Sequence, residues 1–396
     1  MNRSTYTQAA RLARTVGAAA LAAPLGWLAY SALFVNHHLP LPPALPATRE
    51  ELSGPETGRV SFYIDRGGAG RPLVLIHSIN AGASAYEMRP IFERYRGRRP
   101  VFVPDLPGFG FSERSDRVYS PDLYTAAVIR VLEIAAADGP ADVVALSLGG
   151  EFAARAALRR PELVASLALI SPTGFARRPA ATQARSNRPR AVSRAHRVLS
   201  FPLWAQALYD LLVTKPIISF FLKQSFAGPV PRDLLEYDYL TTHQPGARFA
   251  PLYFISGALF SPDIRETVYA ALPQPALVLY DTASFVSFDE LPGFVARHPH
   301  WETARIAPAR DMAHWEQPDA VAAALERFWE RSEPRATRWA GNGAASVDTD
   351  DPLGRSGTPG PLERRNDIEA IFGANGAGMF SLDTPVLEIF LRGTRV

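Results

Sequence analysis

Short apolar segments, separated by stretches with helical spacing, run through the middle of the chain and restrict its possible folds more than any other feature. Each is five to seven residues long and almost wholly apolar, as in strands buried on both faces of a sheet. Strands that alternate with helices form a mostly parallel sheet with helices on both faces. The sequence therefore predicts an α/β fold. The predicted strands are Pro72–Ile76, Pro100–Pro104, Asp142–Leu146, Val164–Ile170 and Ala276–Tyr280, preceded by an alternating strand at Arg59–Asp65.

Helices are predicted between and after these strands. Tyr124–Ala137 follows Ser120 and Pro121, which suit a helix cap and a first helical turn. Glu151–Arg159 and Pro318–Arg331 also have helical spacing. The interval 174–273 interrupts the alternation, because it is long, mostly helical in pattern and rich in aromatic residues. We interpret it as a helical cap inserted into the sheet domain.

Composition excludes several classes of protein. The 396 residues include 47% hydrophobic and 20% charged residues, which rules out a wholly disordered chain. The 42 basic and 39 acidic residues nearly balance, so a dedicated nucleic-acid binder is not expected. The chain has no Cys, which excludes disulfides, thiolate metal sites and a Cys nucleophile. No metal-ligand spacing is found, and we expect neither a metal nor a cofactor.

The N-terminal region has the pattern of a membrane segment. Arg3, Arg11 and Arg14 precede an uncharged run, of which Val16–Val35 spans about 30 Å as a helix. No further Arg occurs before Arg49, so we expect the N-terminus to stay cytoplasmic and the rest of the chain to be extracytoplasmic.

Two alternatives to an anchor stay open. Ala20-Leu21-Ala22 is a weak small-x-small site for cleavage of a signal peptide, after which the protein would be secreted. A soluble Ala-rich helix is the other reading. The expected division of the chain is an anchor or signal with a Pro-rich spacer over 1–50, one α/β domain over 51–332 and a mostly disordered tail over 333–396.

Ser147 is the centre of the predicted chemistry. The run Ala145-Leu-Ser-Leu-Gly-Gly150 follows a buried strand and opens a helix, which is the context of a nucleophile elbow. Such a turn needs small residues on both sides of the serine, and Gly149, Gly150 and Ala145 provide them. The following helix N-terminus offers backbone N–H groups to a developing oxyanion.

At this point the sequence resembles the α/β-hydrolase superfamily, in its serine-nucleophile branch. The resemblance covers about residues 59–331 without the cap. Leu73–Asn80 (LVLIHSIN) is similar to the His-Gly loop of the family, Asp105–Ser112 (DLPGFGFS) to its Asp-x-Pro-Gly-x-Gly-x-Ser loop, and Asp311–Pro318 (DMAHWEQP) to its catalytic-histidine loop.

The resemblance implies roles for individual residues. His314 would be the general base, following Ser147 in the family's order. The backbone N–H groups of Leu148 and Ile79 would form the oxyanion hole, with Ser78 standing where the family has Gly. His77 would be structural, and Glu316 would face solvent or support the histidine loop.

The third triad member is where the sequence departs from the family. The acid normally follows the strand predicted at Ala276–Tyr280, but the expected position falls on Ser284 or Ala283. Three readings stay open. Asp281 serves as a displaced acid, a Ser–His dyad suffices, or the site has lost hydrolysis and kept binding, as in a scaffold protein.

If the site is active, His314 deprotonates Ser147, which attacks a carbonyl carbon, and water resolves the acyl-enzyme. Ser rather than Asp at this position argues against the epoxide-hydrolase and dehalogenase branches. The expected substrate is a small acyl compound, an ester or a relative, of apolar character.

The cap begins with a basic segment that contains no acidic residue. With the predicted anchor, this segment suggests a membrane-facing cap, and a solvated loop is the alternative reading. Its arginines are Arg177, Arg178, Arg185, Arg188, Arg190, Arg194 and Arg197.

Overall fold

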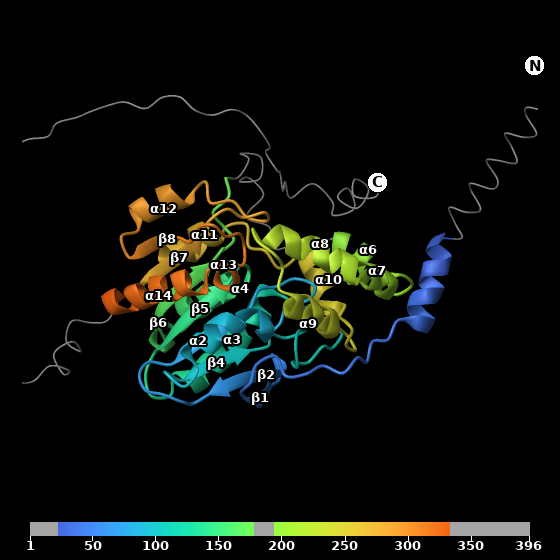
Figure 1. Cartoon of the computed structure of the whole chain (residues 1–396), viewed down its shortest axis with the longest axis horizontal. Coiled ribbons are helices and arrows are strands. Elements are labelled where there is room, and N and C mark those ends of the chain that lie inside the picture. The colour runs from blue at the N-terminus through green and yellow to red at the C-terminus, as the bar shows by residue number, and fades with distance from the viewer. Residues whose placement is uncertain (1–22, 178–193, 333–396) are drawn as a thin grey trace, which may run out of the picture.

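The computed structural model describes residues 23–177 and 194–332, and it confirms the predicted α/β fold. The described strands form one sheet of eight in the order β1-β2-β4-β3-β5-β6-β7-β8 (Figure 1). The strands from β4 to β8 in this order are parallel, whereas β2 pairs antiparallel with β1 and β4. Their bounds are β1 Thr48–Gly54, β2 Gly58–Asp65, β3 Leu73–Ile76, β4 Val101–Pro104, β5 Ala141–Leu146, β6 Val164–Ile170, β7 Ala276–Tyr280 and β8 Trp301–Arg305.

Helices cover both faces of the sheet because alternate residues of each central strand pack to opposite sides. In β5, Val143 and Ala145 join one apolar core, and Val144 and Leu146 join the other. The first core is covered by α3 (Pro121–Ala135), α4 (Gly149–Arg159) and α12 (Leu291–Arg297). The second is covered by α2 (Arg89–Tyr95) and α14 (Pro318–Ser332). Burial on both faces explains why these strands are apolar throughout.

The two edge strands were not predicted. β1 (TREELSG) pairs only with β2, and β8 (WETAR) pairs only with β7. Each is partly exposed and carries charged residues, so neither shows the apolar run of a buried strand. β1 begins within the segment predicted as a spacer, and β8 lies between the predicted strand Ala276–Tyr280 and the predicted helix Pro318–Arg331, where no element was predicted.

The interval between β6 and β7 contains only helices among its described residues, as the predicted cap requires. One group of cap residues forms its own small apolar cluster, which includes Tyr209, Val213 and Ile218. The cap helices are α6 Arg194–Leu199, α7 Ala205–Leu212, α8 Lys215–Ser225, α9 Arg232–Thr242, α10 Phe249–Ile255, α11 Ile264–Thr267 and the 3-10 turn η3 Tyr269–Ala271. The remaining short helices are η1 Ala85–Met88, η2 Pro161–Leu163 and α13 Ala313–Glu316.

The predicted anchor Val16–Val35 lies only partly within the described residues, where Ala23–Phe34 is an apolar helix. In the described part of the chain, no helix is by itself both long and apolar enough to cross a bilayer. The cap helices α7 and α8 reach that length and hydropathy only as a pair, bent by 56°. The predicted tail 333–396 and the central part of the Arg-rich segment, 178–193, lie outside the described residues.

Candidate active site

Ser147 lies on a tight turn between a strand and a helix. β5 ends at Leu146, α4 begins at Gly149, and Ser147 has a φ of 49°. A positive φ is unfavourable for a residue with a side chain and persists only where the surroundings enforce it. The Ser147 N–H donates to the Ile170 carbonyl oxygen at the end of β6, at 2.8 Å. The side chain is partly exposed at the carboxyl edge of the parallel strands.

Gly149 is required by a close approach of two chain segments. A Cβ atom at this position would lie 2.2 Å from the His77 carbonyl oxygen, which is far inside van der Waals contact. The loop after β3 therefore packs directly on the start of α4. This contact brings the two predicted oxyanion-hole segments together. Leu148 and Ile79 are both buried, and neither N–H donates a hydrogen bond to another described residue.

His77 is structural, as the resemblance implied. Its Nε2 accepts from the Leu106 N–H at 2.9 Å, so the proton lies on Nδ1, which donates to the Ser78 carbonyl oxygen at 2.6 Å. Burial lowers the pKa of His77 to about 4. The ring is neutral and connects the loop after β3 to the loop after β4.

His314 is fully buried on α13 and is oriented by a backbone oxygen. Its Nε2 lies 2.8 Å from the Glu87 carbonyl oxygen, which also accepts from Trp315 Nε1 at 2.7 Å. Since a carbonyl oxygen only accepts, Nε2 carries the proton. Nδ1 then has a free lone pair, and it has no hydrogen-bond partner among the described residues. Burial lowers the pKa of His314 to about 4.

Asp281 is bound to groups other than His314. Its carboxylate accepts from Arg305 Nε at 2.7 Å and from the Ala309 N–H at 3.1 Å. Burial raises its pKa, but these hydrogen bonds outweigh burial and hold the pKa below the usual range. Among the described residues, no hydrogen bond links Ser147, His314 and Asp281 into a triad. Their catalytic roles stay predictions.

Glu316 supports the histidine loop, one of the two roles expected for it. Its carboxylate accepts from the N–H groups of Ala227, Gly228 and Arg310 at 2.7 to 2.8 Å. It therefore connects the α8–α9 loop of the cap to the chain that carries His314.

Glu87 was not found by sequence reasoning, although it contacts both halves of the site. Its buried carboxylate accepts from the Ser78 N–H at 2.8 Å, from Ser78 Oγ at 2.9 Å and from Asn80 Nδ2 at 2.7 Å. Burial raises the pKa of Glu87 despite these donors. The same residue holds His314 through its carbonyl oxygen. A lone Glu in a short 3-10 helix carries no sequence signal for such a position.

The cap lies on the predicted oxyanion loop. Tyr209 of α7 donates to the Ala81 carbonyl oxygen at 3.3 Å, and Asp238 of α9 packs on Gly82, where a Cβ atom would be 3.0 Å from that of Asp238. Asp238 is buried and Oδ1 has no partner in the described chain. Burial and the nearby charge of Glu87 raise its pKa well above the usual range.

Glu151 connects the nucleophile elbow to the segment after β6 and to the cap. It is buried on the first turn of α4 and accepts from Thr173 Oγ1 at 2.6 Å and from the Ser261 N–H at 3.1 Å. Burial raises its pKa to about 7. It therefore holds the start of α4 against the segment after β6 and against the end of the cap.

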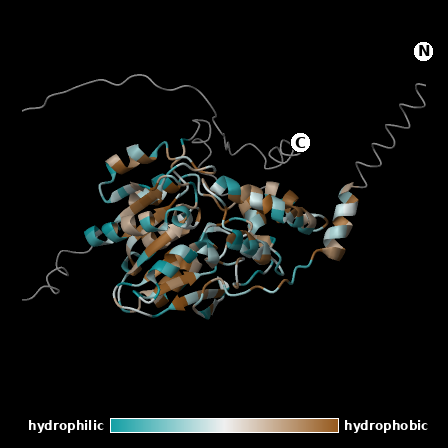
Figure 2. Cartoon of the chain, viewed as in Figure 1, coloured by the Kyte–Doolittle hydropathy of each residue, from teal (hydrophilic) through white to brown (hydrophobic). Residues whose placement is uncertain are grey.

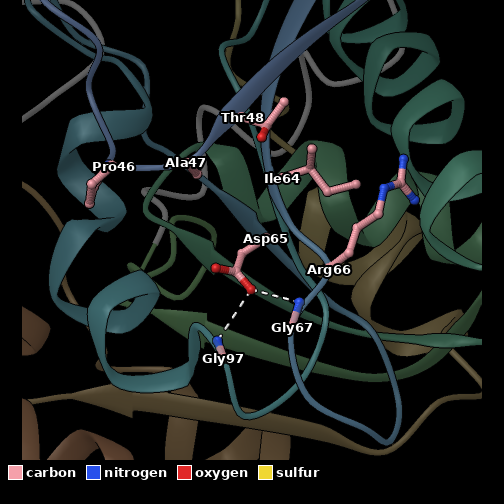
Figure 3. Close-up of a pocket in the computed structure, with 8 residues that line it drawn as sticks. All are labelled: Pro46, Ala47, Thr48, Ile64, Asp65, Arg66, Gly67 and Gly97. Carbon is pink, nitrogen blue, oxygen red and sulfur yellow. Dashed lines mark hydrogen bonds between the residues drawn. The ribbon is translucent and has the colours of Figure 1, made fainter.

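A surface hollow of about 650 Å³ is lined by residues 46–48, residues 64–67 and Gly97 (Figure 3). In it, Asp65 accepts from the N–H groups of Gly67 and Gly97. Asp65 pairs with Val101 at the start of β4, so the hollow is at the amino edge of the parallel strands. Ser147 is at the carboxyl edge, where open α/β sheets bind ligands. Within the described residues, no group of His, Asp and Glu side chains could hold a metal ion.

Comparisons with known proteins agree with the fold. A family model described as the alpha/beta hydrolase family matches residues 73–324. The 2-hydroxymuconate semialdehyde hydrolase of Pseudomonas sp. (strain CF600) is 34% identical over 130 residues, which are 31% of this chain and 46% of that protein. The pimeloyl-[acyl-carrier protein] methyl ester esterase of Xanthomonas oryzae pv. oryzae is 40% identical over 114 residues, 28% of this chain and 41% of that protein.

The matched segments span less than half the length of both curated relatives. Among solved structures, a serine hydrolase involved in carbazole degradation superposes with a TM-score of 0.55 at 18% identity. The match covers 72% of this chain and all of that one. At this identity the likeness concerns the fold alone.

Proposed function

Because this chain belongs to the α/β-hydrolase family, we propose that it is a membrane-associated serine hydrolase that cleaves an ester or related acyl substrate with Ser147 as nucleophile. The observation that carries the proposal is the backbone of Ser147, whose φ is 49° at a turn where Gly149 allows the His77 carbonyl oxygen to approach closely. A strained serine between a strand and a helix is the arrangement that exposes Oγ for attack.

The chemistry follows from the groups around this serine. Ser147 Oγ attacks the carbonyl carbon while His314 takes its proton, and the N–H groups of Leu148 and Ile79 receive the oxyanion. His314 then gives the proton to the leaving group, and a water molecule resolves the acyl-enzyme. His314 Nε2 is hydrogen-bonded to the Glu87 carbonyl oxygen. The proton of Ser147 is therefore taken by the free Nδ1, or by Nε2 after its hydrogen bond to Glu87 breaks.

The engagement of Asp281 with Arg305 supports a Ser147–His314 dyad over a displaced triad acid. The same observation favours the second candidate function, a binding or scaffold protein that has lost hydrolysis. Loss of a triad acid lowers turnover by about 10⁴-fold while geometry persists, so weak but real activity separates a dyad from a scaffold.

Hydrolysis of p-nitrophenyl acetate and butyrate by the full chain tests the proposal. We expect turnover above the buffer rate that disappears in Ser147→Ala. Folded wild-type protein without turnover, or a Ser147→Ala variant that retains it, would favour the scaffold function.

The N-terminal segment supports membrane association and an extracytoplasmic domain. Three Arg before residue 15 and none between it and Arg49 are the charge bias of a cytoplasmic N-terminus. Fusion of alkaline phosphatase after Ser332 checks this, because that reporter is active only outside the cytoplasm. Activity in the membrane fraction is expected, activity in the medium indicates signal cleavage, and an inactive fusion contradicts the proposal.

A further inference from the structure

The helix Ala23–Phe34 buries a polar residue and exposes large apolar ones, which is unusual for a helix on a protein surface. It buries Ser31 and half-buries Trp27, one turn away. Three large apolar side chains of this helix, those of Leu25, Leu33 and Phe34, are 63, 74 and 71% exposed. A helix on a water-soluble surface normally does the reverse, with its apolar stripe packed inward. The exposed side therefore suits an apolar environment.

Polar contacts fix this helix to the cap. Asp210 of α7 is buried and accepts from Ser31 Oγ at 2.5 Å and from Gln206 Nε2 at 2.7 Å. His37 Nε2 lies 2.9 Å from the same carboxylate. Trp27 Nε1 donates to the Ala207 carbonyl oxygen at 2.7 Å. We call these contacts the Asp210 clamp. Removing one partner of a buried charged network is costly, so helix and cap behave as one unit.

The cap carries more exposed apolar side chains on the helices next to the clamp. Val198 of α6 is 61% exposed, and Phe201 and Leu203, between α6 and α7, are 47 and 69% exposed. Phe220 and Phe221 are exposed on α8. Figure 1 places Ala23–Phe34 beside α7, at the end of the molecule away from the sheet, and Figure 2 shows hydrophobic residues along these helices. An apolar surface of this kind marks an interaction site.

Charge distinguishes a membrane from a protein partner. Arg194, Arg197 and Lys223 are exposed on the same cap helices. Between residues 194 and 225 the single carboxylate is that of Asp210, which is buried in the clamp. Exposed apolar and aromatic side chains flanked by basic residues, without acidic ones, are the composition of a surface that lies in the headgroup region of anionic lipid.

We propose that Ala23–Phe34 and the cap residues 198–204 and 220–221 form one lipid-facing surface. It docks the cap on an anionic phospholipid bilayer and admits acyl lipids from that bilayer to Ser147. That the substrates are acyl lipids rests on the proposed hydrolase function, whereas docking on the bilayer is independent of it.

A single helix connects the lipid-facing surface to the site. Asp210 holds the N-terminal helix, and its neighbour Tyr209 donates to the Ala81 carbonyl oxygen in the predicted oxyanion loop. A bilayer docked on this surface would therefore act, through α7, on the loop after β3. Binding that changes the cap would alter hydrolysis of lipid-borne esters more than hydrolysis of soluble ones.

Flotation of the full chain with vesicles tests the surface. Vesicles of phosphatidylcholine alone are compared with vesicles that also contain phosphatidylglycerol, at low and high salt. We expect binding to the anionic vesicles that weakens with salt, and a loss of about tenfold or more in the Phe201→Glu, Leu203→Glu double variant. Val118→Glu is the matched control, because Val118 is 62% exposed but lies outside the lipid-facing surface. It should bind as wild type does.

Activity separates this inference from the proposed function. With Asp210→Asn we expect unchanged hydrolysis of p-nitrophenyl butyrate and at least fivefold slower hydrolysis of a long-chain ester carried in anionic vesicles. If the protein floats with anionic vesicles but hydrolyses no ester, the proposed function is rejected and the lipid-facing surface is supported. Hydrolysis without flotation, equal flotation of the double variant, or a dimer in solution that the double variant dissociates would overturn the lipid-facing surface.

Discussion

His314 is held by a carbonyl oxygen where a serine hydrolase usually has a carboxylate. The Glu87 carbonyl fixes the ring and its tautomer, but it carries no full charge to stabilise the imidazolium that forms during attack. Asp281, which one of the three readings made a displaced triad acid, forms an ion pair with Arg305 instead. The pairing of Asp281 with Arg305 is thus the observation behind the proposed Ser147–His314 dyad, for which we expect slow turnover.

Asp281→Asn tests which group supports His314. If Arg305 and the Ala309 N–H are its functional partners, ester turnover falls by less than about threefold, because no transition-state charge is lost. Steady-state kinetics with p-nitrophenyl butyrate measure this, with the exposed Asp289→Asn as control. A drop of more than about tenfold in Asp281→Asn alone would return Asp281 to the catalytic site.

Glu151 should make folding stability depend on pH. Its pKa is raised to about 7 in the folded chain, so the folded state binds a proton that the unfolded state has already released above about pH 5. Stability from this group is present at low pH and is lost as pH rises to 7, by an amount of the order of 3 kcal/mol.

Urea unfolding at about pH 5 and about pH 8 measures this effect. Glu151→Gln, which cannot ionise, should gain stability relative to wild type at the higher pH. Glu56→Gln, at an exposed glutamate between β1 and β2, should show no such trend. An equal wild-type-to-Gln difference at both pH values would mean that Glu151 does not titrate in this range.

The turn between β5 and α4 is the element that could be predicted best. Its signals are local: a buried apolar strand, a serine, two glycines and a helix follow each other within a few residues. The edge strands β1 and β8 were not predicted, because they lack the apolar run of a buried strand and their pairing depends on residues far apart in the sequence. Because β8 was not predicted, its pairing with β7, which places Arg305 beside Asp281, could not be foreseen. Asp281 therefore remained a candidate for the triad acid.

Gly149→Ala tests the elbow as an element. The added Cβ would lie 2.2 Å from the His77 carbonyl oxygen, so the elbow and the loop after β3 must separate, at a cost of about 1–3 kcal/mol. We expect ester turnover to fall by about tenfold or more and the urea midpoint to drop. Gly293→Ala in α12 is the control, since its nearest contact would be 3.6 Å and no loss is expected. Wild-type turnover in Gly149→Ala would show that the close packing is not needed.

In the whole molecule, three N-terminal elements lie outside the family match. The match begins at residue 73, so the helix Ala23–Phe34, β1 and β2 all precede it. Sequence patterns predicted an apolar N-terminal segment and a cap, but not their attachment through Asp210. Neither Ser31 nor His37 carries a signal that points to a residue more than 170 positions away. The contact of His314 with Glu87 was hidden for the same reason, since a backbone oxygen has no sequence signature.

The most direct test of the central claim is covalent labelling of the full chain with a fluorophosphonate, with the modified peptide identified by mass spectrometry. The probe reacts with serines that a base and an oxyanion hole activate. We predict a single modified residue, Ser147, in wild-type protein, slower labelling in His314→Gln and none in Ser147→Ala. Folded wild-type protein that stays unlabelled, or that is labelled at another serine, would contradict the account.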